Sequence, residues 1–291
     1  MDKERLIVLT GAGGYIGRSL IQRVMDKTTW RVCAFSSSLE FDNNKWGDRV
    51  VIRPNEQICS VLPTMKDTDT CVHLAFSRRF KSNSDIALSI DFSSELFKAA
   101  LSCGCRLINM STVGVYGVNL VFPDEKTTPA PDSLYSMAKY ASEVLMRSFY
   151  QNESIDATNL RLSGIAQSQR VLPVFIENAK TKGEIQIVGG KQQFSWIDID
   201  DAVDAIIALI RYDGKWRNAY NVSLNKQRYQ IMELAGIVSA LAQEKGYGRT
   251  LVTVSPSNEI PICVGWNSEA FITDTGWLPQ VTIGEIIKKM F

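Results

Sequence analysis

Near its amino end the chain reads Leu6-Ile7-Val8-Leu9-Thr10-Gly11-Ala12-Gly13-Gly14-Tyr15-Ile16-Gly17. Four apolar residues in a row are typical of a strand that is buried on both faces, as in a parallel sheet. The glycines that follow allow a tight turn and a close approach of the backbone to a ligand, because they carry no Cβ atom. A helix expected over residues 15–27 would present the N–H groups of its first turn to a pyrophosphate. This stretch therefore predicts a strand, a turn and a helix that together bind a nucleotide.

The spacing of these glycines, Gly11-x-x-Gly14-x-x-Gly17, differs from the common dinucleotide fingerprint, which has glycines at positions one, three and six. A turn that merely requires small residues is the alternative interpretation. The context favours nucleotide binding, because a second strand is expected over residues 30–35, where a βαβ unit requires it.

The first half of the chain alternates between expected strands and helices. The strands are expected at 6–10, 30–35, 49–53, 70–75, 106–110 and 157–162, and the helices at 15–27, 84–102 and 133–150. This alternation predicts an α/β fold with a doubly wound parallel sheet, whose ligand crevice lies at the carboxyl ends of the strands. We expect residues 1–165 to form the dinucleotide-binding domain, with 196–222 returning to it. Residues 166–195 and 223–291 would form a smaller substrate-binding lobe.

Composition narrows the class of protein. The 291 residues carry a net charge of +1 without clustered basic residues, so the sequence lacks a nucleic-acid footprint. No apolar run is long enough to cross a bilayer, and residues 1–5 lead directly into the first expected strand, leaving no room for a signal peptide. Six scattered cysteines are typical of free thiols in a reducing compartment. We expect a cytoplasmic protein that binds neither nucleic acid nor membrane.

The chain contains one histidine, His73, within an apolar strand-like segment. A single histidine excludes a multi-histidine metal site and argues against a histidine-activated nucleophile. We therefore expect no metal, and we expect His73 to be a buried strand residue with a local hydrogen bond.

A pair of residues in the expected helix 133–150 can perform proton chemistry. Tyr135 and Lys139 are four residues apart, so they share one face of a helix. An ammonium about 5 Å from a phenol, at an effective dielectric near 20, favours the phenolate by roughly 3 kcal/mol. That is about two pKa units, which brings the phenol close to working pH. Thr112, at a strand end, is expected to hydrogen-bond the same reacting oxygen.

Chance also produces Tyr-x-x-x-Lys pairs, but Tyr135 is the only one of nine tyrosines followed four residues later by lysine. Together with other motifs, the pair makes the chain resemble an extended short-chain dehydrogenase/reductase of the NAD-dependent epimerase/dehydratase family. The motifs lie at residues 10–17, 72–75, 111–117, 135–139, 196–202, 218–222 and 275–279. The resemblance implies a Rossmann domain with a small α/β C-terminal substrate lobe.

The resemblance also implies residue roles. Tyr135 would be the acid/base, Lys139 would bind the nicotinamide ribose and tune Tyr135, and Thr112 would polarise a substrate carbonyl or hydroxyl. Hydride would pass between nicotinamide C4 and a carbon of a sugar, typically one carried by a nucleoside diphosphate. The expected dinucleotide contacts are Gly11, Gly14, Tyr15, Ile16, Gly17, Arg18, Ser36, Ser37, Leu74, Ala75, Tyr135 and Lys139. The expected substrate contacts are Ser77, Thr112, Val113, Ser163 and Arg170.

One departure from the family pattern concerns the cofactor. Members that prefer NAD carry an acidic residue at the end of the second strand, whereas this chain has Ser36-Ser37-Ser38. Arg18 would meet a 2′-phosphate, with the serines donating hydrogen bonds. A solvated arginine beside a polar loop is the alternative interpretation. We expect NADP(H) to be favoured, with NAD(H) as the alternative.

Other departures concern the substrate and the proton relay. Gln193-Phe194-Ser195 stands where the family supplies an arginine to the substrate diphosphate, and Ser163 replaces an asparagine that often contacts it. Arg170 or Lys191 would have to bind the substrate diphosphate in their place. Ser89 replaces an asparagine that helps to hold active-site backbone and water.

Three functions remain open from the sequence. A reductase of a nucleotide-linked 4-keto sugar is favoured, a nucleotide-sugar 4-epimerase is the alternative, and a non-catalytic dinucleotide-binding regulator is a more distant one. Dehydration is disfavoured, because Val113 and Gly114 stand where dehydratases usually carry an acidic pair. By resemblance, we expect a homodimer joined through the helices at 84–102 and 133–150.

Overall fold

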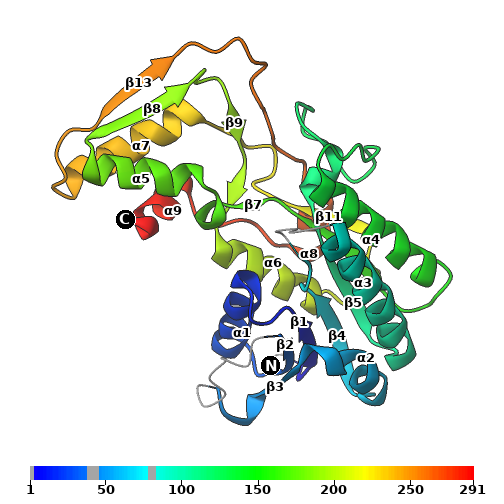
Figure 1. Cartoon of the computed structure of the whole chain (residues 1–291). Helices are drawn as coiled ribbons and strands as arrows, with labels where there is room; N and C mark the ends of the chain where they lie inside the picture. Colours follow the sequence, from blue (N-terminus) through cyan, green and yellow to red (C-terminus); the bar gives the residue numbers. More distant parts are fainter. Residues whose placement is uncertain (1–2, 38–45, 78–82) are drawn as a thin grey trace.

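A computed structural model describes residues 3–37, 46–77 and 83–291. Its centre is a seven-stranded sheet in the order β11-β6-β5-β4-β1-β2-β3, in which every neighbouring pair is parallel (Figure 1). The strands are β1 (Leu6–Thr10), β2 (Arg31–Ser36), β3 (Val50–Pro54), β4 (Thr68–His73), β5 (Arg106–Thr112), β6 (Ala157–Leu162) and β11 (Ala219–Val222). The order reverses beside β1, as in a Rossmann fold. The predicted α/β doubly wound sheet is confirmed.

Helices cover both faces of this sheet. On one face α1 (Tyr15–Lys27) packs against α6 (Ile199–Arg211), and on the other α3 (Asn83–Cys103) packs against α4 (Leu134–Tyr150), near the short helix α2 (Ile58–Val61). Ile7 and Leu9 belong to the core on the α1 side, whereas Val8 belongs to the core on the α3 side. Because successive strand residues point to opposite faces, this double burial accounts for the unbroken apolar run in β1.

A smaller α/β layer lies at one end of the sheet (Figure 1). It contains α5 (Val171–Thr181), β8 (Glu184–Val188), α7 (Ile231–Glu244), β13 (Leu251–Ser255) and α9 (Ile283–Met290). Strands β8 and β13 pair in parallel, and a separate apolar core that includes Leu172, Ile185, Leu234 and Ile286 holds the helices to them. Two short ladders are formed by β7 (Gly164–Ile165) with β10 (Trp196–Ile197) and by β9 (Gln193–Phe194) with β12 (Tyr229–Gln230). Helix α8 (Glu269–Thr275) packs on β11 and α6. The single-turn 3-10 helices are η2 (Gly47–Arg49), η3 (Asn55–Gln57), η4 (Leu62–Thr64), η5 (Val113–Tyr116) and η6 (Ala166–Ser168).

Two details differ from the sequence patterns. The strand expected at 70–75 ends at His73, because the hydroxyl of Thr10 takes the N–H groups of Leu74 and Ala75 at 3.2 and 3.1 Å. Helix α8 was not predicted, and its Phe271 packs edge-on against Tyr220 of β11, in the core of the main sheet. Within the described ranges, no helix has both the length and the apolar composition needed to cross a bilayer.

Candidate active site

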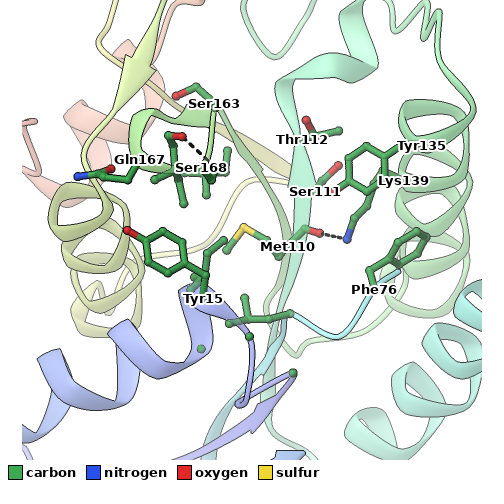
Figure 2. A pocket seen from close by; sticks show the side chains of 18 residues that line it. Tyr15, Phe76, Met110, Ser111, Thr112, Tyr135, Lys139, Ser163, Gln167 and Ser168 are labelled. Atoms are coloured by element: carbon green, nitrogen blue, oxygen red, sulfur yellow. Dashed lines mark hydrogen bonds between the residues drawn. The ribbon is translucent and has the colours of Figure 1, made fainter. Parts of the chain in front are cut away.

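A cavity of about 500 Å³ opens at the carboxyl ends of β1, β4, β5 and β6 (Figure 2). It is lined by Gly11, Gly14, Tyr15, Ile16, Gly17, Leu74, Phe76, Met110, Ser111, Thr112, Tyr135, Lys139, Leu162, Ser163, Gly164, Ile165, Gln167 and Ser168. The glycine turn and the three expected catalytic residues, which are more than 90 residues apart in the chain, therefore share one cavity. A crevice at this end of the strands is where open parallel sheets bind ligands.

The glycine turn has the geometry that close ligand approach requires. Gly11 has a φ of +67°, and a Cβ atom there would lie 2.7 Å from the backbone nitrogen of Ala75. A Cβ on Gly17 would lie 2.5 Å from the carbonyl oxygen of Gly11. Gly14 precedes α1 and provides no side-chain cap for the N–H groups of its first turn. Uncapped N–H groups at a helix N-terminus can hydrogen-bond an anion such as a pyrophosphate.

A second cavity of about 390 Å³ adjoins the first across this turn. Its lining consists of Gly11, Gly13, Gly14, Ser36, Ser37, Asn55, Ala75 and Phe76. A turn that presents Gly11 and Gly14 to both cavities fits a dinucleotide, which has one nucleoside on each side of its pyrophosphate. Arg18 is exposed, and its Nε donates to the carbonyl of Gly13 at 2.8 Å, whereas Ser38 lies outside the described residues.

Helix α4 carries the expected acid/base pair. Ser133 caps the helix by accepting the N–H of Ser136 at 3.2 Å, which fixes where the helix begins. Lys139 is 2% exposed, and its Nζ donates to the carbonyl of Met110 at 2.7 Å. The same Nζ lies 4.0 Å from the ring centre of Phe76, which meets the Tyr135 ring edge-on. The ammonium of Lys139 is thus held at the cavity wall beside the phenol (Figure 2).

Thr112 faces the same cavity from the end of β5. Its Oγ1 accepts the N–H of Gly114 at 3.1 Å, which leaves the hydroxyl hydrogen for donation to a ligand. Tyr135 and Thr112 therefore line the same cavity, from α4 and β5.

A buried chain of hydrogen bonds runs from Thr10, which precedes the glycine turn, through His73 to Ser93. Thr10 Oγ1 already accepts two N–H groups, so its hydrogen goes to Nδ1 of His73 at 2.8 Å. Nε2 of His73 therefore carries the ring proton and donates to Ser93 Oγ at 3.0 Å. Burial, with a smaller contribution from the charge of Lys139, lowers the pKa of His73 to about 3. The expected buried histidine with a local hydrogen bond is confirmed.

The expected substrate contacts lie in different surroundings. Thr112 and Ser163 line the large cavity. Val113 is buried with Val115, Tyr116 and Trp266, and the exposed Arg170 immediately precedes α5. The N–H of Ser77 donates to Ser89 Oγ at 3.3 Å. Ser89 therefore holds the backbone after β4, and Ser77, Val113 and Arg170 remain predicted substrate contacts.

Several lining residues were absent from the predicted site. Phe76 lies three residues beyond β4 and Ser111 is the penultimate residue of β5, so both belong to the strand ends where the sequence predicts the ligand crevice, although neither was assigned a role. Gln167 and Ser168 belong to the 3-10 turn after β7 and carry no motif. Across residues 3–37, 46–77 and 83–291, no group of three or more His, Cys, Asp or Glu side chains is placed to hold a metal ion.

Comparison with known families decides the class. The model of the NAD-dependent epimerase/dehydratase family matches residues 7–223. The chain belongs to this family. Membership confirms the predicted extended short-chain dehydrogenase/reductase and the prediction of an NAD(P)-dependent enzyme.

Individual relatives are distant but extend over most of the chain. The NAD-dependent glucose-6-phosphate dehydrogenase of Haloferax volcanii is 23% identical and aligns over 81% of this chain and 91% of its own length. The dTDP-4-dehydro-6-deoxyglucose reductase of Escherichia coli is 20% identical, over 98% of this chain and 96% of its own. The dTDP-glucose 4,6-dehydratase of Bacillus anthracis, solved with NAD, superposes with a TM-score of 0.81 at 17% identity, covering 98% and 94% of the two chains. This last likeness establishes a shared fold.

Proposed function

We propose that this family member is a reductase that transfers hydride from a nicotinamide dinucleotide to the keto carbon of a nucleotide-linked 4-keto sugar. The observation that carries the proposal is the convergence of Tyr135, Lys139 and Thr112 on the cavity beside the glycine turn. The distant relationship to a dTDP-4-dehydro-6-deoxyglucose reductase supports the same reaction class. Convergence of three such groups argues against a non-catalytic regulator.

The chemistry follows from the positions of these groups. A reduced dinucleotide held by the glycine turn and Lys139 would supply the hydride for the carbonyl carbon. Tyr135 gives its phenolic proton to the oxygen as the carbonyl bond becomes a C–O single bond, so an alcohol forms and a phenolate remains. The buried ammonium of Lys139 stabilises this phenolate, and solvent returns the proton after release. Thr112 donates a hydrogen bond to the same oxygen as its negative charge develops.

Replacing the phenol tests the reaction. In Tyr135→Phe we expect turnover to fall about 100-fold or more, because the proton donor is lost. Tyr140→Phe is the matched control, since Tyr140 lies on the same helix and packs on the Val113 cluster. The measurement is NADPH or NADH oxidation with a panel of nucleotide-linked 4-keto sugars. Wild-type turnover in Tyr135→Phe would refute the assignment, and redox-neutral interconversion of nucleotide sugars would favour the 4-epimerase.

We further propose a preference for NADP(H). Arg18 is tied to Gly13, which lines the second cavity together with Ser36 and Ser37, so its guanidinium lies on the side where a 2′-phosphate would bind. In Arg18→Ala we expect NADPH affinity to fall roughly 10-fold and NADH affinity to stay within about 2-fold, since one charge-assisted contact is lost. Fluorescence titration gives both dissociation constants. Tighter binding of NADH by the wild type would overturn the preference.

A further inference from the structure

Helix α4 carries a third residue on the face that holds Tyr135 and Lys139. Glu143 lies four positions beyond Lys139 and is 3% exposed. Its carboxylate contacts the guanidinium of Arg161, on β6, through Nη2–Oε2 at 2.7 Å and Nε–Oε1 at 3.0 Å. Arg161 is buried as well, so each charge requires the other.

Further hydrogen bonds fix the arginine in place. Arg161 Nη1 donates to the hydroxyl of Tyr116 at 2.7 Å, and Tyr116 donates to Oδ1 of Asn221 at 2.9 Å. Burial outweighs the nearby guanidinium and raises the pKa of Tyr116 to about 12, so its hydroxyl remains a donor. Arg161 is thus held by groups from η5 and α4, and it holds the Glu143 carboxylate at one position.

The carboxylate of Glu143 is linked to the cavity by a hydrogen bond from the lining residue Ser111. Ser111, next to Thr112 at the end of β5, donates its hydroxyl hydrogen to Oε1 of Glu143. A serine hydroxyl has a single hydrogen and two lone pairs. Because the hydrogen is committed to a buried carboxylate, Ser111 offers only lone pairs to the cavity that it lines (Figure 2). Thr112 has the opposite hydrogen-bonding role. Its Oγ1 accepts the N–H of Gly114, and its hydroxyl hydrogen can be donated to a ligand.

We propose that Glu143 is a positioning residue, which makes Ser111 an obligate hydrogen-bond acceptor for a hydroxyl group of the bound ligand. Ser111 and Thr112 then make opposite hydrogen bonds to two ligand oxygens. Ser111 accepts from an alcohol, and Thr112 donates to a carbonyl or a developing alkoxide. The identity of the ligand rests on the proposed function. The hydroxyl belongs to the nicotinamide ribose or to the sugar, and the two sources are separable by experiment.

A double-mutant cycle tests this role. In Ser111→Ala, which leaves the Glu143–Arg161 pair intact, we expect ligand affinity to fall about 5- to 10-fold, as for a lost neutral hydrogen bond. Glu143→Gln should weaken the same parameter, because an amide can donate to Ser111 and turn its hydrogen toward the cavity. Since Glu143 acts through Ser111, the double variant should be no weaker than the weaker single variant. The readouts are the dissociation constants of NADPH and NADH by fluorescence, and KM and kcat for the keto sugar.

A second, half-buried ion cluster provides the control. Asp69, near the amino end of β4, accepts from Arg5 at 2.7 Å and from Arg106 at 2.6 Å, at the end of the sheet opposite the cavity. Asp69→Asn should lower the unfolding midpoint in urea as Glu143→Gln does, yet leave every ligand parameter unchanged and combine additively with Ser111→Ala. A merely structural Glu143 would behave in the same way as Asp69.

The outcomes separate clearly. Weakened dinucleotide binding in Ser111→Ala identifies the ribose hydroxyl, and a raised KM with unchanged dinucleotide binding identifies the sugar hydroxyl. Either result supports the proposal. Ligand parameters at wild-type values in Ser111→Ala, or additive losses in the double variant, overturn it while the proposed function stands. A wild-type protein that neither binds a dinucleotide nor turns over a sugar overturns both.

Discussion

At the scale of single residues, His73 shows how burial sets a protonation state. Its ring is wholly enclosed between Thr10 and Ser93, and burial, followed by the charge of Lys139, lowers its pKa to about 3. The unfolded chain has an ordinary histidine pKa near 6.5. The unfolded state therefore binds one more proton than the folded state between these two values.

This difference predicts an acid-sensitive stability. As pH falls from about 6.5 toward 3, the contribution of neutral His73 to the unfolding free energy is lost at about 1.4 kcal/mol per pH unit. Between pH 7 and pH 5 the wild type should lose about 2 kcal/mol more than His73→Gln, which cannot titrate. Urea denaturation of both proteins at the two pH values measures this difference. Equal losses in the two proteins would contradict the assignment of a buried neutral histidine.

At the scale of elements, the turn between β1 and α1 depends on one backbone conformation. The turn packs against residues 74–75, which follow β4 directly. Gly11 lies so close to their backbone that it has no room for a Cβ atom. Gly104, after α3, also has a positive φ of +83°, but a Cβ atom there would meet nothing within 4 Å. Comparing substitutions at the two positions therefore distinguishes the cost of a left-handed backbone, which both share, from the cost of a steric clash, which only Gly11 has.

Alanine at each position should reveal this difference. Both substitutions carry the cost of a left-handed backbone, about 1 kcal/mol. Gly11→Ala adds a clash with backbone atoms, which we expect to cost about 1–3 kcal/mol more and to weaken dinucleotide binding about 10-fold or more. Urea denaturation and fluorescence titration measure the two effects. Wild-type affinity in Gly11→Ala would show that the turn does not approach the dinucleotide.

At the scale of the whole molecule, α3 and α4 pack side by side on one face of the sheet (Figure 1). Leu88 of α3 and Leu134 and Met137 of α4 are at least half exposed. The homodimer that the sequence resemblance predicts is joined through these two helices, so it would remove these side chains from water.

We therefore expect light scattering to give twice the chain mass of 32.5 kDa. Met137→Glu should give the monomer mass at the same concentration, because it places a charge in the predicted interface. Val174→Glu is the control, since Val174 is 52% exposed on α5 in the smaller lobe, and it should leave the mass unchanged. A wild type at the monomer mass at all concentrations would remove the dimer.

Short-range patterns were sufficient for much of the fold and for half of the site. The buried β1, the glycine turn and α1 follow from neighbouring residues, because strand alternation and glycine conformation are local properties. Tyr135 and Lys139 were found in the same way, since a helix places residues four apart on one face. The limits of most elements agreed with these patterns to within one or two residues, for example α1 and β6.

Long-range packing supplied what these patterns lacked. Helix α8 exists because Phe271 is buried against Tyr220 and Trp277, a contact that no local spacing encodes. Ser111, Glu143 and Arg161 come from three separate elements, and no local spacing predicts the contacts among them. Their roles follow from tertiary packing. Burial makes each charge depend on its partner, and it commits the hydroxyl hydrogen of Ser111 to one acceptor.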